Sequence, residues 1–220
     1  RLLIIGCGLL GSSILRAASS KKLSKKIFIY EKSNKNISEV KKLKIPCQIL
    51  KNLNKDISDI DFVIICTPMS EYHKIIPKLN AHLSSKSIIT DVGSTKTNVL
   101  KLIKKQLEKK LKWIPSHPIA GSEVSGPEYG NKNLFLNKWC VIIREKTTNL
   151  KKLKVLKKFW KKLGSQVIFM DANNHDKIFS ITSHLPHLIA YNLIKTAKDF
   201  EKIQKNNLIK FSAGGLRDFS

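Results

Sequence analysis

The residues best suited to chemistry follow short apolar runs in the middle of the chain. His117 comes directly after "KWIPS", and Ser122 and Glu123 stand a few positions further on. Histidine has an ordinary pKa of about 6.5, which suits proton transfer near neutral pH. Ser94, in "DVGSTK", follows an earlier apolar run, offers a hydroxyl near the expected ligand crevice and could also cap the next helix. His117 and Ser94 are therefore the candidate catalytic residues, with a purely structural histidine as the alternative.

A second candidate site lies near the N-terminus, where "GCGLLG" places Gly6, Gly8 and Gly11 in the spacing G-x-G-x-x-G. The pattern follows an apolar strand and opens a helix. In that context it indicates a dinucleotide site, because glycines permit the tight turn and the close approach of a pyrophosphate. We expect the start of the helix, with Leu9 and Leu10, to face the phosphates. A glycine-rich turn without a ligand is the alternative.

Glu31 lies 20 residues beyond Gly11, at the end of the second expected strand. A carboxylate at that place accepts hydrogen bonds from the ribose hydroxyls and repels a 2′-phosphate, which favours NAD over NADP. Lys32 and Lys35 weaken that preference, so NADP stays an alternative. Thr67 and Pro68 end the next strong strand and should border the nicotinamide, unless they only terminate the strand.

Two further histidines, His184 and His187 in "SITSHLPH", are three positions apart. They share one helix face if the helix continues through Pro186. A metal site is an alternative, but no H-E-x-x-H motif is present and His175 is not suitably spaced. We therefore expect no metal and assign the two histidines to an anionic substrate, with structural histidines as the remaining alternative.

Alternating strands and helices must position these residues. Strands are expected at 1–6, 26–31, 61–68, 86–94, 112–118, 139–145 and 166–170, with helices at 10–20, 70–83, 95–111 and 150–163. Such alternation predicts an α/β fold with a doubly wound, mostly parallel sheet of the Rossmann type. After Met170 the pattern becomes helical. We expect a nucleotide-binding domain at 1–171 and the start of an all-helical domain at 172–220, in a chain that is a fragment of a longer one.

Composition excludes several classes of protein. The formal net charge is +25, but only four of the 41 basic residues are arginines and the lysines are scattered, which argues against a nucleic-acid site. A positive field would instead attract an anionic substrate. No apolar run approaches the roughly 18 residues of a membrane span. The four cysteines form no C-x-x-C motif, so we expect reduced thiols and a cytoplasmic protein.

Six segments, taken together and in order, resemble the prephenate and arogenate dehydrogenases. These segments are "GCGLLGSS", "CTP", "DVGSTK", "HPIAGSEVSGPEYG", "HDKIFSITSHLPH" and "FSAGGLRDFS". The resemblance spans nearly the whole chain. The glycine fingerprint is generic, whereas the histidine-containing runs are specific to this family. The wording "GSEVSGPEYG" is most similar to that of the cyclohexadienyl dehydrogenases, which accept prephenate, arogenate or both.

The resemblance implies an NAD-dependent oxidative decarboxylation of prephenate to 4-hydroxyphenylpyruvate, or of arogenate to tyrosine. It also implies a helical dimerisation domain, truncated here, and a homodimer at full length. His117 would take the proton of the substrate hydroxyl, assisted by Ser94. Ser122 and Glu123 would form the entrance, with Glu123 as a gate. The same resemblance assigns substrate contacts to three further residues, His184, His187 and Arg217.

Two other functions fit parts of the sequence. A β-hydroxyacid type of Rossmann dehydrogenase would share the cofactor site, but it usually carries a catalytic lysine where His184 and His187 stand here. A non-catalytic basic binding module would explain the charge, and it predicts nucleic-acid affinity that falls steeply with salt.

Overall fold

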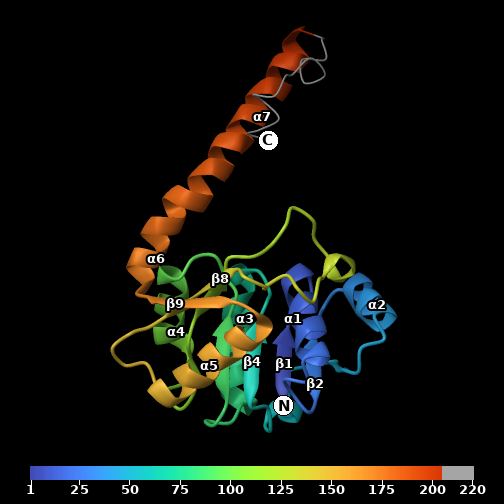
Figure 1. Cartoon of the computed structure of the whole chain (residues 1–220), viewed down its shortest axis with the longest axis vertical. Coiled ribbons are helices and arrows are strands. Elements are labelled where there is room, and N and C mark those ends of the chain that lie inside the picture. Colours follow the sequence, from blue (N-terminus) through green and yellow to red (C-terminus); the bar gives the residue numbers. More distant parts are fainter. Residues whose placement is uncertain (205–220) are drawn as a thin grey trace. The chain divides into compact units, whose positions relative to one another are not determined.

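The structure is a computed structural model that describes residues 1–204 of the 220-residue chain (Figure 1). The chain divides into two compact units. The first is Arg1–Ala172, and the second begins at Asn173. Each unit is described by itself below.

A six-stranded parallel sheet forms the centre of the first unit, in the order 3-2-1-4-5-6. Its strands, in spatial order, are β3 (Gln48–Leu50), β2 (Ile27–Tyr30), β1 (Leu2–Ile5), β4 (Phe62–Ile65), β5 (Ile88–Asp91) and β6 (Lys112–Trp113). Chain order reverses between β1 and β4, which is where open α/β sheets bind ligands. The expected doubly wound parallel sheet is confirmed.

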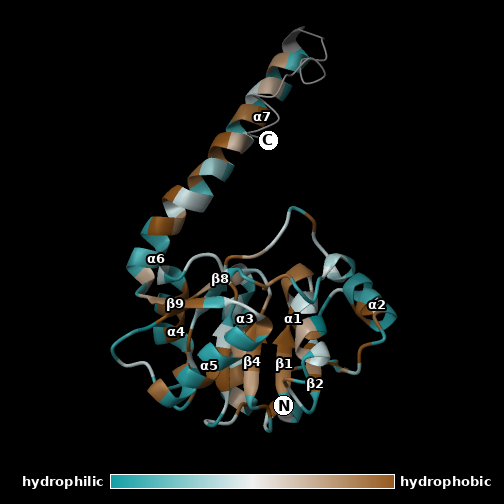
Figure 2. Cartoon of the chain, in the orientation of Figure 1, coloured by the Kyte–Doolittle hydropathy of each residue, from teal (hydrophilic) through white to brown (hydrophobic). Residues whose placement is uncertain are grey.

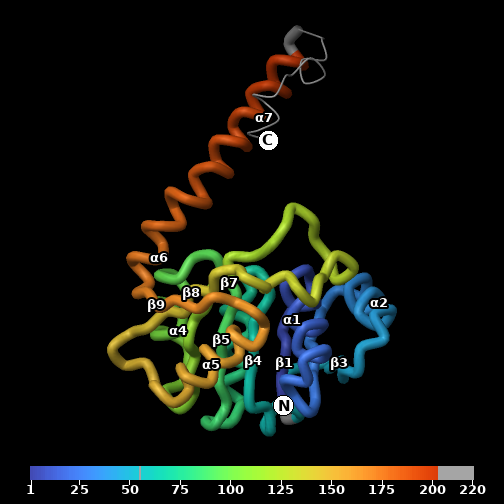
Figure 3. Tube along the Cα trace, in the orientation of Figure 1, coloured from blue at the N-terminus to red at the C-terminus, as the bar shows by residue number. Residues whose placement is uncertain are grey.

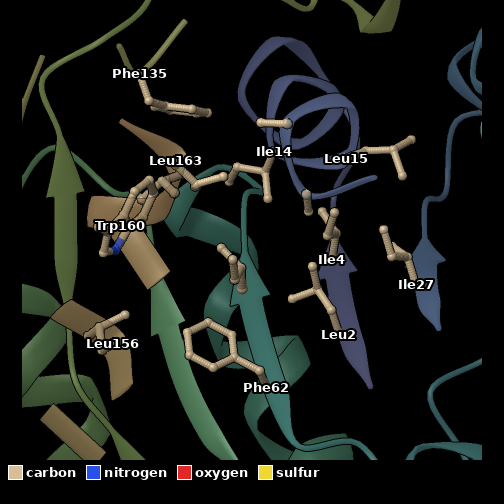
Figure 4. Packing of buried hydrophobic residues seen from close by; sticks show 14 of the residues in the cluster. Leu2, Ile4, Ile14, Leu15, Ile27, Phe62, Phe135, Leu156, Trp160 and Leu163 are labelled. Atoms are coloured by element: carbon tan, nitrogen blue, oxygen red, sulfur yellow. The ribbon is translucent and has the colours of Figure 1, made fainter. Parts of the chain in front are cut away.

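Helices cover both faces of this sheet because β1 and β4 are apolar on both sides. Leu2 and Ile4 pack with α1 (Leu9–Ser20) and α5 (Leu150–Leu163) in one buried cluster (Figure 4). Leu3 and Ile5 pack on the opposite face with α3 (Tyr72–His82) and α4 (Thr97–Gln106). Figure 2 shows the hydrophobic colouring concentrated on β1 and β4. Such doubly buried strands read as continuous apolar runs in sequence, and this is why they were predictable.

A second, smaller sheet consists of β7 (Ser116–Pro118), β8 (Trp139–Ile143) and β9 (Gln166–Met170), with β7 antiparallel and β9 parallel to β8 (Figure 3). The prediction of one strand over 112–118 is wrong. Ile114 still donates its N–H to Ile89 beside β6, but Pro115 has no N–H with which to extend that ladder. The chain crosses to the small sheet at Pro115, whose carbonyl accepts from Ile143.

Several other elements differ from the sequence-based expectation. The structure adds β3 and the helix α2 (Asn34–Lys42), which were not predicted. The helix expected over 95–111 ends at Gln106, because Asn80 of α3 donates to the Gln106 carbonyl and accepts from Glu108. Ser94 does not cap that helix, because the capping position is occupied by Lys96. Three 3₁₀ turns complete the first unit, at Lys55–Ile57, Met69–Glu71 and Pro127–Tyr129.

The helical run that ends the described chain comprises α6 (Ala172–Phe179), a π-helical turn at Ser180–His184 and α7 (Leu185–Gln204). The helix continues through Pro186, which was the condition for His184 and His187 to share one helix face. π-Turns interrupt helices mainly where function demands a changed register. Within residues 1–204, none of the helices combines the length and apolar content of a membrane span.

Candidate cofactor and active site

The glycine fingerprint forms the turn between β1 and α1, and each glycine meets a different constraint. Gly6 has φ +86°, and a Cβ on it would lie 2.8 Å from Cγ2 of Thr67. A Cβ on Gly11 would overlap the carbonyl oxygen of Gly6. Around Gly8, by contrast, no atom of the described residues other than Gly8 and its two chain neighbours would lie within 4 Å of an added Cβ. Gly6 and Gly11 thus build the turn, while Gly8 leaves its outer side open.

Unpaired backbone donors face outward at the start of α1. The first intrahelical bond runs from the N–H of Ser12 to the carbonyl of Gly8, so the preceding N–H groups, including those of Leu9 and Leu10, have no partner within the helix. Among the described residues, no side chain caps this helix. The side chain of Leu10 packs against the core. The helix start therefore presents free donors and positive dipole charge, which suit a phosphate.

Glu31 lies at the carboxyl end of β2 and holds the turn in place. One of its oxygens accepts from the N–H of Cys7 at 2.7 Å, and the other accepts from the N–H groups of Lys32 and Ser33 at 2.8 and 2.9 Å. The oxygen that accepts from Cys7 has room for one more donor, whereas the other already accepts two. The carboxylate therefore has a structural role that the sequence did not reveal, and it can still accept a hydrogen bond from a ribose hydroxyl.

A cavity of about 310 Å³ lies over these strand ends. Five residues expected to bind cofactor line it: Gly6, Gly8, Glu31, Thr67 and Pro68. They come from the ends of β1, β2 and β4, which are in parallel register at Ile5, Tyr30 and Ile65. The hydroxyl oxygen of Thr67 is buried and finds no hydrogen-bond partner within the described part of the chain. An orphaned donor beside an open glycine is the arrangement that a bound dinucleotide would complete.

An ion pair crosses the rim of the same cavity. Lys32 donates to Glu71 at 2.8 Å, and Lys74 donates to the other oxygen of Glu71 at 2.8 Å. Hydrogen bonds from Lys32 and Lys74 lower the pKa of Glu71 to about 2. The carboxylate is therefore ionised at any working pH, and it keeps Lys32 away from the position beside Glu31.

Ser94 follows a strand of the main sheet, and His117 belongs to the small sheet. Ser94 is exposed in the loop after β5, and His117 is half-buried in β7. Between them lies a buried ion pair, in which Lys96 donates to Asp91 at 2.6 Å. Lys96 also donates to the carbonyl of Ser116, at 2.7 Å. The residue before His117 is thus tied directly to the loop that carries Ser94.

Comparison with known proteins assigns most of the chain to two family models. Residues 15–169 match the family model described as the nucleotide-binding domain of prephenate dehydrogenase, and residues 171–220 match its dimerization domain. The chain belongs to the prephenate dehydrogenase family. The resemblance read from the sequence is confirmed, and so is the assignment of an α/β nucleotide-binding domain followed by a helical dimerisation region.

Individual relatives agree with this assignment. The cyclohexadienyl dehydrogenase of Zymomonas mobilis is 30% identical over 215 residues, which cover 98% of this chain and 73% of that protein. The prephenate dehydrogenase of Lactococcus lactis is 31% identical, and the chain spans 60% of its length. The crystal structure of prephenate dehydrogenase from Aquifex aeolicus in complex with hydroxyphenyl propionate and NAD⁺ superposes with a TM-score of 0.90 at 33% identity, covering 99% of this chain and 76% of that one.

The other predicted site residues of this family member lie in a loop of the first unit, in the second unit, or outside the described residues. Ser122 and Glu123 are exposed in the loop that follows β7. His184 is half-buried and His187 exposed, both in the helical run of the second unit. Arg217 falls outside the described residues.

Sequence reasoning missed two residues of the site, Asp91 and Lys96. Both stand in the quoted segment "DVGSTK", and both side chains are fully buried. Charged residues are rarely buried unless they are paired, so an aspartate that ends an apolar strand, followed five positions later by a lysine, was the available signal. Among the described residues, no cluster of histidine, cysteine, aspartate or glutamate side chains could hold a metal ion.

Proposed function

We propose that the full-length protein is an NAD-dependent dehydrogenase that oxidatively decarboxylates prephenate, arogenate or both. The observation that carries this proposal is the cavity at the β1/β4 reversal, with open space at Gly8, in a chain of the prephenate dehydrogenase family. The buried hydroxyl of Thr67 and the free N–H groups of α1 fit a dinucleotide. Bound NAD would accept a hydride from C4 of the substrate ring.

His117 is the proposed base of this reaction. As the hydride leaves C4, the imidazole takes the proton of the C4 hydroxyl, and Ser94 donates a hydrogen bond to the same oxygen. The ring carboxylate leaves as carbon dioxide, and its bonding electron pair completes the aromatic ring. His117 then returns its proton to the phenolate oxygen. Positioned acid–base help of this kind contributes about 10²–10⁴-fold.

The remaining residues are proposed to bind the substrate. His184 and His187 would contact its carboxylates. Ser122 and Glu123 would form the entrance, and Arg217 would contact the substrate or the dimer interface. Positive charge on the protein would favour capture of a substrate that carries two carboxylates.

We also propose that the protein acts as a homodimer in the cytoplasm. The match of residues 171–220 to a dimerization domain supports a second copy as partner. Large apolar side chains of the second unit are exposed in the single chain, and such surfaces are typical of interfaces. Examples are Ile181, Leu188 and Tyr191, which are 67%, 58% and 72% exposed. Four free cysteines agree with a reducing compartment.

The test is cofactor reduction, followed by absorbance, with the full-length protein. Prephenate and arogenate are each offered with NAD and with NADP. Turnover with NAD and either substrate supports the proposal, and His117→Asn should then lower kcat by at least about 10²-fold. His73→Asn is the matched control, because His73 is exposed on α3. A folded dimer that binds NAD but turns over neither substrate would refute the assignment.

A further inference from the structure

The most unusual group in the first unit is the buried pair formed by Asp91 and Lys96. The side chains of both residues are 0% exposed. Removing two charges from water costs several kcal/mol per ion, and well-packed apolar residues often stabilise a fold as much or more. A role in stability alone therefore does not explain why a lysine occupies this position. What an apolar side chain could not do is hold a carbonyl group.

Asp91 anchors the lysine from the main sheet. Its Oδ2 accepts from Lys96 at 2.6 Å, from the hydroxyl of Tyr72 at 3.2 Å and from the N–H of Gly93 at 3.0 Å, while its Oδ1 accepts from the indole of Trp113 at 3.1 Å. The bond to Gly93 shapes the loop that carries Ser94. Asp91 is thus fully engaged, and the position of the ammonium group is determined by it.

Lys96 also binds a strand of the small sheet. Its ammonium donates at 2.7 Å to the carbonyl of Ser116, the residue directly before His117. The hydroxyl of Ser116 donates to the carbonyl of Asp91 at 2.8 Å, and the indole of Trp160 donates to that hydroxyl at 3.1 Å. Ser116 is therefore held through both its carbonyl and its side chain. Because neighbouring residues of a strand point to opposite faces, fixing Ser116 also fixes the direction of His117.

We propose that Lys96, anchored by Asp91, is a positioning residue that holds His117 in register with the Ser94 loop. The proposal rests on the proposed function, since it assumes that His117 acts as the base. Lys96 itself acts through the backbone and exchanges no proton with the substrate. A displacement of about 1 Å from reactive geometry costs on the order of 10²-fold in rate. Loss of the lysine should therefore lower kcat by about 10–100-fold and leave the Kd of NAD within about twofold.

The informative variant neutralises both charges at once. Lys96→Met alone would leave a buried, partly uncompensated carboxylate, which strongly destabilises a fold, whereas Asp91→Asn with Lys96→Met leaves no unpaired buried charge. We expect this double variant to melt near the wild-type temperature and to lose kcat. Asp91→Asn with Lys96→Gln keeps a donor directed toward the Ser116 carbonyl and should regain part of the lost kcat.

A matched control exists in Lys152. Its ammonium also bridges two backbone carbonyls, those of Ser85 and Ser87, at 2.7 and 2.8 Å. These residues lie away from the strand ends that carry the site. Lys152→Met should lower stability and leave kcat unchanged. If the double variant of Asp91 and Lys96 is stable and keeps the wild-type kcat, the positioning role is wrong and the pair is only structural.

A second readout does not depend on turnover. This chain has six histidines, so ¹⁵N-histidine labelling gives few imidazole signals from it. The signal of His117 is assigned by its loss in His117→Asn. In the double variant with methionine it should shift or broaden, while those of His73 and His82 on α3 stay unchanged. An unmoved His117 signal would overturn the positioning role even if the substrate proved to be another one. Failure of the proposed function would instead appear as absent turnover by the wild-type protein.

Discussion

Replacing Gly8 by alanine separates cofactor binding from folding. Apart from Gly8 and its two chain neighbours, no atom of the described residues would lie within 4 Å of the new Cβ, and Gly8 has φ −75°, which alanine adopts without strain. A Gly→Ala change at a compatible position gains about 0.4–1 kcal/mol through the unfolded state. Loss of a glycine at the N-cap costs a similar few tenths to about 1 kcal/mol. The two effects nearly cancel, so the folded protein should be as stable as the wild type.

Cofactor affinity should respond very differently. If the pyrophosphate approaches the backbone at Gly8, the methyl group occupies its place and the phosphate moves away from the N–H groups of α1. Losing one charge-assisted hydrogen bond costs about 1.5–3 kcal/mol, which corresponds to a roughly 10- to 150-fold weaker Kd. We expect isothermal titration of NAD to show this loss. The melting temperature should stay within about 4 °C, because 1 kcal/mol shifts a protein of this size by about 2–4 °C.

Gly11→Ala is the internal comparison. Its Cβ would overlap the carbonyl of Gly6, so α1 must move away from β1 or the turn must open. Alanine gains about 1 kcal/mol in helix propensity over glycine, and this gain cannot offset a backbone overlap. Gly11→Ala should therefore lower both stability and affinity. An unchanged NAD affinity in Gly8→Ala would refute the placement of the pyrophosphate and, with it, the reading of the fingerprint.

Two further predictions concern the same cavity, and a third concerns the reactivity of two cysteines. Thr67→Val should raise the melting temperature of the cofactor-free protein, because an unsatisfied buried hydroxyl costs about 1–3 kcal/mol, and should weaken NAD binding. Glu71→Gln should free the Lys32 side chain to bind a 2′-phosphate. The NADP/NAD ratio of kcat/KM should then rise by about tenfold, because Lys32 would form one charge-assisted hydrogen bond that only NADP can accept. Thiol labelling of the native protein at pH 8 should modify Cys47 before Cys7, because burial and then the charge of Glu31 raise the pKa of Cys7 to about 12 and the thiolate is the reactive form.

Each of these predictions has its own control and contrary result. Glu39→Gln removes a comparable half-buried carboxylate, paired with Lys42, and should leave the NADP/NAD ratio unchanged. An unaltered ratio in Glu71→Gln as well would mean that Lys32 does not reach the cofactor. For Thr67→Val, an unchanged melting temperature would mean that the hydroxyl is already satisfied. Rapid labelling of Cys7 would contradict its burial in the turn.

The parts of the fold predicted from sequence are those with a strong local signal. Strands such as β1 and β4 are buried on both faces and appear as unbroken apolar runs, and the fingerprint has its own spacing. The edge strand β3 has three residues, of which only Leu50 is buried, and α2 buries only Val40. Elements that bury so little leave no periodic pattern, and this explains why neither was predicted.

Other features depend on partners that meet only in the fold. The end of α4 is set by Asn80, a residue 26 positions earlier than the carbonyl it binds. The split of the strand at Pro115 depends on a competing ladder with β8. Glu31 holds the glycine turn through its hydrogen bond from the N–H of Cys7, a residue 24 positions earlier, and no local pattern in the sequence encodes that contact. In each case the sequence names a suitable residue, but only the tertiary structure supplies its partner.

The cofactor side of the site, at β1 and β4, and the side that carries Ser94 and His117, at β5 and β7, differ in how their polar groups are paired. At β1 and β4, polar groups at the start of α1 and at Thr67 have no partner within the described residues, so that a ligand can form hydrogen bonds with them. At β5 and β7 the buried polar groups around Asp91 are paired, and this pairing would hold the proposed base, His117, in a constant direction. Hydride transfer and proton transfer must occur on the same substrate carbon and its oxygen. Lys96 connects the fixed side to the loop that borders the open side, which is why its loss should affect kcat and spare cofactor binding.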